Sequence, residues 1–187
     1  MLRCRVSAIS FVLLATYASL AVAELPTQIN ISGQALKLNG SGKRTKTFVN
    51  IYESGLYLRT PSRDANAILA ADDLMAIRVK ITSGFVSRSS LVASLEESLK
   101  KSTKGNTAAI AKETEMFKTS LKDEVQKNDI YDFVYVPTKG LYVMKNGTLK
   151  GNIPGVPFKK ALFGIWLSDS PVDKGLRQAM LSGPSRR

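Results

Sequence analysis

The polar side chains best suited to ligand chemistry lie together in residues 38–58, LNGSGKRTKTFVNIYESGLYL. Arg44 carries a guanidinium that stays charged and can hold a carboxylate through two parallel hydrogen bonds. Tyr52 supplies a hydroxyl that can donate one more. Because side chains two residues apart share a strand face, Arg44, Asn50 and Tyr52 are expected on one face. This pattern predicts an anion site, and the alternative is an ordinary hairpin with a basic tip and a buried aromatic ring.

Composition narrows the chemistry further. The chain has 187 residues, no histidine and one cysteine, Cys4. The lack of histidine excludes imidazole acid–base chemistry, histidine-based triads and histidine metal ligands. No Asp or Glu cluster has the spacing of a metal site, so neither a metal nor a cofactor is expected. Any catalysis would have to use Arg, Lys, Tyr, Ser, Thr or carboxylates, and Arg44 and Tyr52 are the candidates for it.

The amino terminus has the pattern of a secretory signal. Arg3 and Arg5 precede an apolar run over residues 6–20, and Ala-Val-Ala at 21–23 supplies a small-residue cleavage pattern. The run is shorter than the roughly 20 residues of a membrane span, so no transmembrane helix is expected after processing. The predicted location is periplasmic or secreted, and Cys4 would leave with the signal.

These observations divide the chain into three parts. Residues 1–23 are the predicted signal peptide, residues 24–183 a single domain, and residues 184–187 a disordered tail. The middle part is long enough for one compact domain with a real core.

The charge balance indicates which partners the surface attracts. The sequence has 27 Lys and Arg against 15 Asp and Glu, a net charge of +12. This surplus favours acidic lipids, polyanionic envelope sugars or small carboxylates. Nucleic acid is not expected as a partner, because an arginine cluster and an exposed aromatic run are both missing. A basic surface that only maintains solubility is the alternative.

Periodicity and turn residues predict the order of the elements. The chain should form strands, then helices, then strands, then helices, which fits an α+β domain with an antiparallel sheet covered by helices. A turn is expected at Asn39, Gly40 and Gly42. Ser89 or Ser90 should cap the first long helix, and Ser170-Pro171-Val172-Asp173 should start the last one. The expected strands cover 29–31, 34–38, 74–81, 129–136, 141–144 and 148–153, and residues 38–58 should form a further strand or a hairpin. The expected helices cover 64–71, 89–101, 107–122, the stretch from 158, and the stretch from 170 to 181.

Two long motifs resemble the chalcone isomerase-like superfamily, in particular its bacterial exported branch. GSGKRTKTFVNIYESGLYL, residues 40–58, resembles the glycine-x-glycine-x-arginine hairpin of that family and its glycine-x-tyrosine strand end. FKKALFGIWLSDSPVDKGLRQAML, residues 158–181, is similar to its closing helices. With the NGTLKG hairpin at 146–151, the resemblance covers nearly the whole mature chain.

The resemblance implies an open-faced β-sandwich of the chalcone isomerase type, an antiparallel sheet with a helical layer and a ligand cleft between them. Plant enzymes of this fold close a phenolate ring onto a conjugated ketone, and related non-catalytic members bind fatty acids through an arginine and a tyrosine. Arg44 matches the family arginine, and Tyr52 falls where the fatty-acid binders carry their tyrosine. Residues 85–98 contain neither the tyrosine nor the asparagine that the enzymes use there, so any isomerase activity should be slight.

The sequence thus favours an exported, non-catalytic protein that binds a fatty acid or similar apolar carboxylate, with Arg44 at the head group beside Tyr52 and Asn50. One alternative is an isomerase or intramolecular lyase acting on a conjugated ketone. The other is a structural or interaction protein of the envelope, whose cleft is filled by its own side chains and whose basic face meets an anionic surface. Trp166 is expected in the core.

Overall fold

The structure is a computed structural model that describes residues 25–183. The predicted signal peptide and the predicted tail at 184–187 lie outside the described residues. The strands are β1 (Gln28–Ile31), β2 (Gln34–Lys46), β3 (Val49–Leu58), β4 (Met75–Ile81), β5 (Ile130–Val136), β6 (Gly140–Lys145) and β7 (Thr148–Ile153). The helices are α1 (Ala65–Ala70), α2 (Arg88–Ser102), the short 3₁₀ helix η1 (Ala108–Ile110), α3 (Ala111–Ser120), α4 (Val156–Leu167) and α5 (Lys174–Met180).

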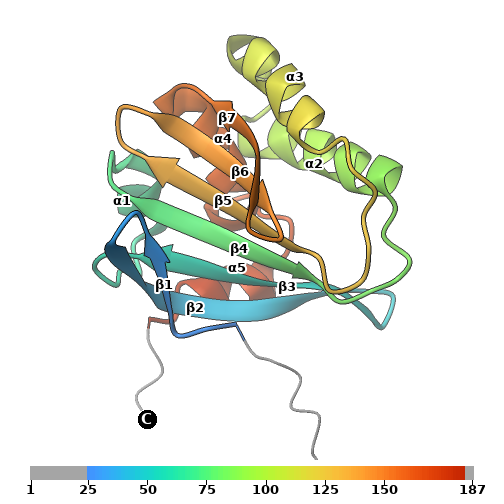
Figure 1. Cartoon of the computed structure of the whole chain (residues 1–187), viewed down its shortest axis with the longest axis horizontal. Helices are drawn as coiled ribbons and strands as arrows, with labels where there is room; N and C mark the ends of the chain where they lie inside the picture. The colour runs from blue at the N-terminus through green and yellow to red at the C-terminus, as the bar shows by residue number, and fades with distance from the viewer. Residues whose placement is uncertain (1–24, 184–187) are drawn as a thin grey trace, which may run out of the picture.

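The strands form one seven-stranded antiparallel sheet in which each strand pairs with the next along the chain, β1 to β7. Figure 1 shows α4 and α5 behind this sheet and α2 with α3 beyond its upper edge. The α+β class, the antiparallel sheet and the helical layer predicted from the sequence are therefore confirmed.

The main core lies between the sheet and the helices. Alternate residues of β4, Ile77, Val79 and Ile81 among them, face this core, while Arg78 lies on the other face. The α4 helix is buried along most of its length, from Phe158 to Leu167. A helix packed on several sides needs no polar stripe, which explains its almost wholly apolar sequence.

A turn was expected at Asn39, Gly40 and Gly42, but these residues lie inside β2. The prediction was wrong because Gly40 and Gly42 are needed for close contact with α5, which is distant in the sequence, and not for a turn. A Cβ at Gly40 would lie 2.1 Å from the Ala179 carbonyl oxygen. The buried Asn39 amide donates to the carbonyl of Met180 at 2.8 Å, so a bulged stretch of β2 holds the last helix.

The turn of this hairpin lies instead at Thr47 and Phe48, between β2 and β3. Both residues have left-handed backbone angles, with φ of 47° and 67°. Two-residue hairpin turns normally place Asn and Gly at such positions, so sequence rules gave no signal for a turn here. Residues 44 and 52 consequently lie on two neighbouring strands rather than along one.

Two helix caps also differ from the expected ones. Ser87, rather than Ser89 or Ser90, caps α2, and Ser90 returns the hydrogen bond in a capping box. Asp173 caps α5 through the backbone N–H of Leu176 at 2.8 Å, so the helix starts after Asp173 and Pro171 is not at its first position.

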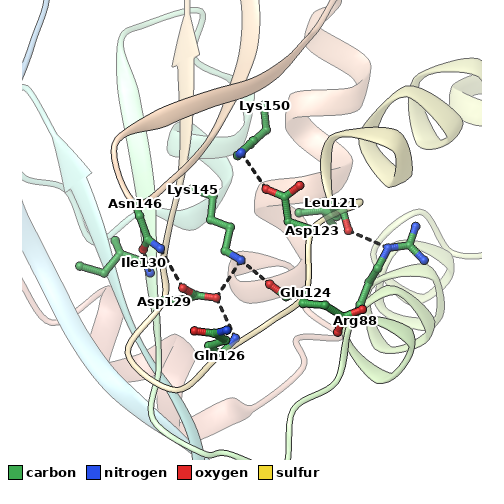
Figure 2. A network of polar contacts seen from close by, with 10 residues as sticks. All are labelled: Arg88, Leu121, Asp123, Glu124, Gln126, Asp129, Ile130, Lys145, Asn146 and Lys150. Atoms are coloured by element: carbon green, nitrogen blue, oxygen red, sulfur yellow. Dashed lines mark hydrogen bonds and ion pairs between the residues drawn. The ribbon is translucent and has the colours of Figure 1, made fainter.

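A polar network fixes the loop between α3 and β5 to the sheet (Figure 2). Asp129 accepts hydrogen bonds from the Asn146 amide and the Gln126 backbone N–H, both at 2.8 Å, and pairs with Lys145 at 2.9 Å. Burial alone would raise the pKa of Asp129, but these donors together hold it below its usual range. Lys145 also donates to the Glu124 carbonyl, so the loop is held at several points.

The same network reaches α2. The Arg88 guanidinium, in the first turn of α2, donates to the Leu121 carbonyl at 3.0 Å, and Lys150 pairs with Asp123 at 2.7 Å (Figure 2). Near its other end, Ser102 donates to the Ala161 carbonyl of α4 at 2.7 Å. Both ends of α2 are thus tied down by polar contacts, which fixes the helix that walls the site described below.

Within residues 25–183, none of the helices is long and apolar enough to cross a membrane. In that same part of the chain, no group of three or more acidic residues is placed to hold a metal ion.

Candidate functional site

The β2–β3 hairpin brings Arg44 and Tyr52 together as register partners on neighbouring strands. The guanidinium carbon of Arg44 lies 6.0 Å from the centroid of the Tyr52 ring, within range of a cation–π contact. A register shift directly after Arg44 places Ile51 as the extra residue of β3. The structure thus brings the two side chains together across two strands, whereas the sequence argument aligned them by alternation along one strand face.

Trp166 of α4 joins the pair. Its indole Nε1 donates a hydrogen bond to the Tyr52 hydroxyl at 3.1 Å, and the two side chains are 2% and 8% exposed. Because the hydroxyl oxygen already accepts from the indole, its own hydrogen remains available to a ligand. Trp166 was predicted as a core residue, and the structure shows that it also orients the tyrosine of the site.

Burial keeps the hydroxyl of this tyrosine neutral. Burial raises the pKa of the Tyr52 phenol above its usual range, although the positive charge of Arg44 and the hydrogen bond from Trp166 act in the opposite direction. A neutral phenol is a hydrogen-bond donor, whereas a phenolate would repel an anion. Arg44 and Tyr52 together therefore present a fixed positive charge and a neutral donor.

The pair stands where two adjoining pockets meet. The inner pocket has a volume of about 40 Å³ and lies between β3 to β5 and the helices α2 and α4. The outer pocket has a volume of about 250 Å³ and opens beside the hairpin and the β4–α2 loop. Arg44 and Tyr52 line both, and most other lining side chains of the inner pocket are apolar or aromatic: Val79, Ile81, Leu91, Leu95, Tyr131, Phe133, Ile165 and Trp166.

The α2 wall carries hydroxyls that sequence reasoning missed. Ser94 lines both pockets and Ser98 the inner one, on the helix face that also presents Leu91 and Leu95. The Ser98 hydroxyl donates to the Ser94 carbonyl at 2.7 Å, so it is already satisfied. The sequence could have indicated them, because Ser94 and Ser98 are four residues apart and such residues lie on the same side of a helix.

Asn50, the third predicted ligand residue, lies away from the pair. It is exposed near the hairpin turn, its side-chain oxygen accepts from the Thr45 hydroxyl at 2.8 Å, and it lines neither pocket. The reason is the register shift of the hairpin, because the extra residue at Ile51 breaks the alternation that would have aligned Asn50 with Tyr52.

Arg44 forms no ion pair with a carboxylate of residues 25–183. The Glu97 carboxylate of α2 pairs with Lys101 at 2.6 Å, and the more distant positive charges of Lys46 and Arg44 only help to lower its pKa. A guanidinium beside an apolar pocket, without a carboxylate partner from the described chain, can accept an anionic group from outside.

An antiparallel sheet, helices on one face, and an apolar pocket with an arginine and a tyrosine at its mouth define an α+β protein with an enclosed site between its layers. The chain belongs to the chalcone isomerase-like family, whose sequence profile matches residues 17–182.

A solved structure of an Arabidopsis thaliana fatty-acid binding protein is similar to it, with a TM-score of 0.66 and 21% sequence identity, over 84% of this chain and 90% of the plant chain. At this identity the likeness concerns the fold. Comparison with curated protein sequences finds no match.

Proposed function

We propose that this protein binds a fatty acid or a similar apolar carboxylate, with the carboxylate at Arg44 and Tyr52. The observation that carries the proposal is the Arg44 guanidinium, which has no carboxylate partner among the described residues and stands beside a neutral tyrosine hydroxyl at the mouth of an apolar pocket. The family membership and the likeness to a protein named for fatty-acid binding support it.

The tail of such a ligand would run from the outer pocket toward the inner one. Pockets for ligands of drug size have volumes of about 300 to 1,000 Å³, and neither pocket reaches this range by itself. Accommodation of a long tail therefore requires the side chains of Leu91 and Leu95 to move outward. Their helix is held by polar contacts near its two ends, with apolar packing between them.

The small inner volume favours a second candidate. A cleft filled by its own side chains fits a structural or interaction protein of the envelope, in which Arg44 would meet an anionic partner at the surface. The two candidates differ in whether a free fatty acid in solution saturates a single site.

The test is a palmitate titration followed by the fluorescence of Trp166, the only tryptophan of the chain. A hydrogen bond to a charged group contributes about 1.5 to 3 kcal/mol, so Arg44→Ala should weaken palmitate binding about tenfold to a hundredfold. Lys43→Ala is the matched control, because it removes the same charge from the other face of β2.

The methyl ester of palmitate should bind the wild type and Arg44→Ala equally, since it lacks the charge that Arg44 recognises. Absence of saturable palmitate binding, or equal palmitate affinity of Arg44→Ala and wild type, would reject the proposal in favour of the interaction protein.

The proposal includes export to the periplasm or the outside of the cell, supported by the signal pattern of residues 1–23. Mass spectrometry of protein recovered from the periplasmic fraction or the medium should give a chain that begins at Glu24. A chain that retains Met1 in the cytosolic fraction would contradict export.

A further inference from the structure

Two phenylalanine side chains stand in solvent on the two segments that border the outer pocket, the β2–β3 hairpin and the β4–α2 loop. Phe48, in the β2–β3 turn, is 99% exposed, and Phe85, in the β4–α2 loop, is 89% exposed and lines the outer pocket. A single exposed apolar residue is ordinary, but two strongly exposed aromatic rings on neighbouring segments are not.

Hydrogen bonds connect the two segments that carry these rings. The Thr82 hydroxyl donates to the Asn50 carbonyl at 2.9 Å, and the backbone N–H groups of Thr82 and Ser83 both point to the Ile51 carbonyl, at 3.1 and 3.3 Å. The hairpin and the β4–α2 loop thus form one rim, which Figure 1 shows at the ends of β3 and β4. We call Thr47, Phe48, Phe85 and Val86, together with Lys46, the aromatic rim.

The backbone at Phe48 adds an independent observation. Its φ of 67° follows a φ of 47° at Thr47, and both are disfavoured for residues with a Cβ, most of all for a bulky ring. Such backbone conformations of residues with a Cβ concentrate at functional sites, which supports a role for the exposed ring. Phe48 lies four residues beyond Tyr52, which places it about 13 Å further out along the hairpin.

The charge around the rim is mostly positive. The hairpin end, residues 43–53, carries Lys43, Arg44 and Lys46 against a single carboxylate, Glu53. Glu53 is in register with both Lys43 and Lys80, so cations flank it on each neighbouring strand. Exposed aromatic rings beside lysines are the composition that binds the interface of an anionic bilayer.

We propose that the aromatic rim docks the protein on an anionic lipid bilayer, with Phe48 and Phe85 inserted at the interface and the hairpin cations over the lipid head groups. The outer pocket then opens toward the bilayer, because the same loops line it. This surface stands whether or not the pocket ligand is a fatty acid, and a partner of this chemistry explains both the rings and the lysines.

The test is co-sedimentation of the full chain with vesicles, without added fatty acid. Vesicles of phosphatidylglycerol and phosphatidylcholine in equal amounts should bind the protein, and binding should weaken with salt and with phosphatidylcholine alone. Phe48→Ala and Phe85→Ala should each lower the partition coefficient about tenfold, because each removes a ring that the interface would bury. Lys46→Gln should weaken binding and reduce its dependence on salt.

Leu149→Ala is the matched control, because Leu149 is 56% exposed on β7, far across the sheet from the hairpin. Residues 1–24 are the same in every variant, so differences between variants report on the rim. Equal partitioning of wild type, Phe48→Ala and Phe85→Ala would overturn the proposal.

Equal binding to both lipid compositions would also overturn it. Self-association that the phenylalanine variants abolish, without vesicle binding, would instead assign the rim to a second copy of the chain. The palmitate titration is a separate measurement, so failure of docking and failure of ligand binding can be told apart.

Discussion

Replacement of Tyr52 by phenylalanine isolates the hydrogen bond on which the geometry of the site depends. The ring stays in place, so apolar burial is kept, but the Trp166 Nε1–H loses its acceptor at 3.1 Å. A buried donor without a partner costs about 1 to 3 kcal/mol. The loss of stability within this range depends on whether a water molecule can replace the hydroxyl as acceptor.

The volume of the inner pocket indicates how large the loss of stability should be. It borders both side chains and has a volume of about 40 Å³, whereas a single water needs roughly 10 to 15 Å³. A water can therefore enter and accept the indole N–H. We expect a loss near the lower end, about 1 kcal/mol, which lowers Tm by about 2 to 4 °C in a domain of this size.

Urea unfolding provides the assay, followed by circular dichroism because the change alters the surroundings of Trp166. The midpoint should fall while the m-value stays unchanged. Tyr142→Phe, on the opposite face of the sheet, is the control and should leave stability as it is. A loss above about 3 kcal/mol, or none, would refute the view that Tyr52 holds Trp166 by a bond that water can replace.

Two further predictions concern other parts of the fold. Gly40→Ala should destabilise the protein by about 1 to 3 kcal/mol in urea unfolding, because its Cβ would lie 2.1 Å from the Ala179 carbonyl oxygen. Gly84→Ala, whose Cβ meets nothing within 4 Å, should be neutral, and equal effects would contradict this account. Burial lowers the pKa of Lys159 to about 8 from 10.5. Between these two pH values the unfolded chain binds a proton at Lys159 that the folded chain has lost, so stability should rise with pH. Burial raises the pKa of Tyr135 to about 12 from 10.0, so above about pH 10 the folded chain keeps a proton that the unfolded chain loses, and the trend reverses. Unfolding of Lys159→Met from about pH 8 to 10 should lack this rise, and the same slope in both proteins would exclude Lys159 as its source.

The parts of the fold that local pattern controls were predictable. The alternation along β4, MAIRVKI, requires a strand with one buried face, and the apolar run of α4 requires a helix with neighbours on several sides. Asp64 caps α1, which lies inside the predicted helix range 64–71. Such signals act over one or two turns, so a single sequence contains them.

The errors occurred where a distant segment or an unusual turn decides the structure. Gly40 was interpreted as a turn residue because glycine is common in turns, yet it is required by α5, about 140 residues further along the chain. The turn at Thr47 and Phe48 contains neither of the residue types that such turns favour, asparagine and glycine, so the sequence did not indicate it.

In the site, Arg44 and Tyr52 were proposed from their residue types and strand spacing, and the family resemblance supported the choice. The register shift that separates Asn50 from them, and the contact of Trp166 with Tyr52, depend on three-dimensional packing.

The contact between β2 and α5 can form only late in folding, because its two segments lie near opposite ends of the domain. Every strand pairs with its predecessor, and the β1–β2, β2–β3, β5–β6 and β6–β7 pairs are joined by short turns, so these hairpins can form locally as the chain emerges. Asn39 and Met180, by contrast, are 141 positions apart. Docking of α5 therefore needs nearly the whole chain, and until it occurs the polar groups of Asn39 and the backbone at Gly40 remain open to water or to other chains.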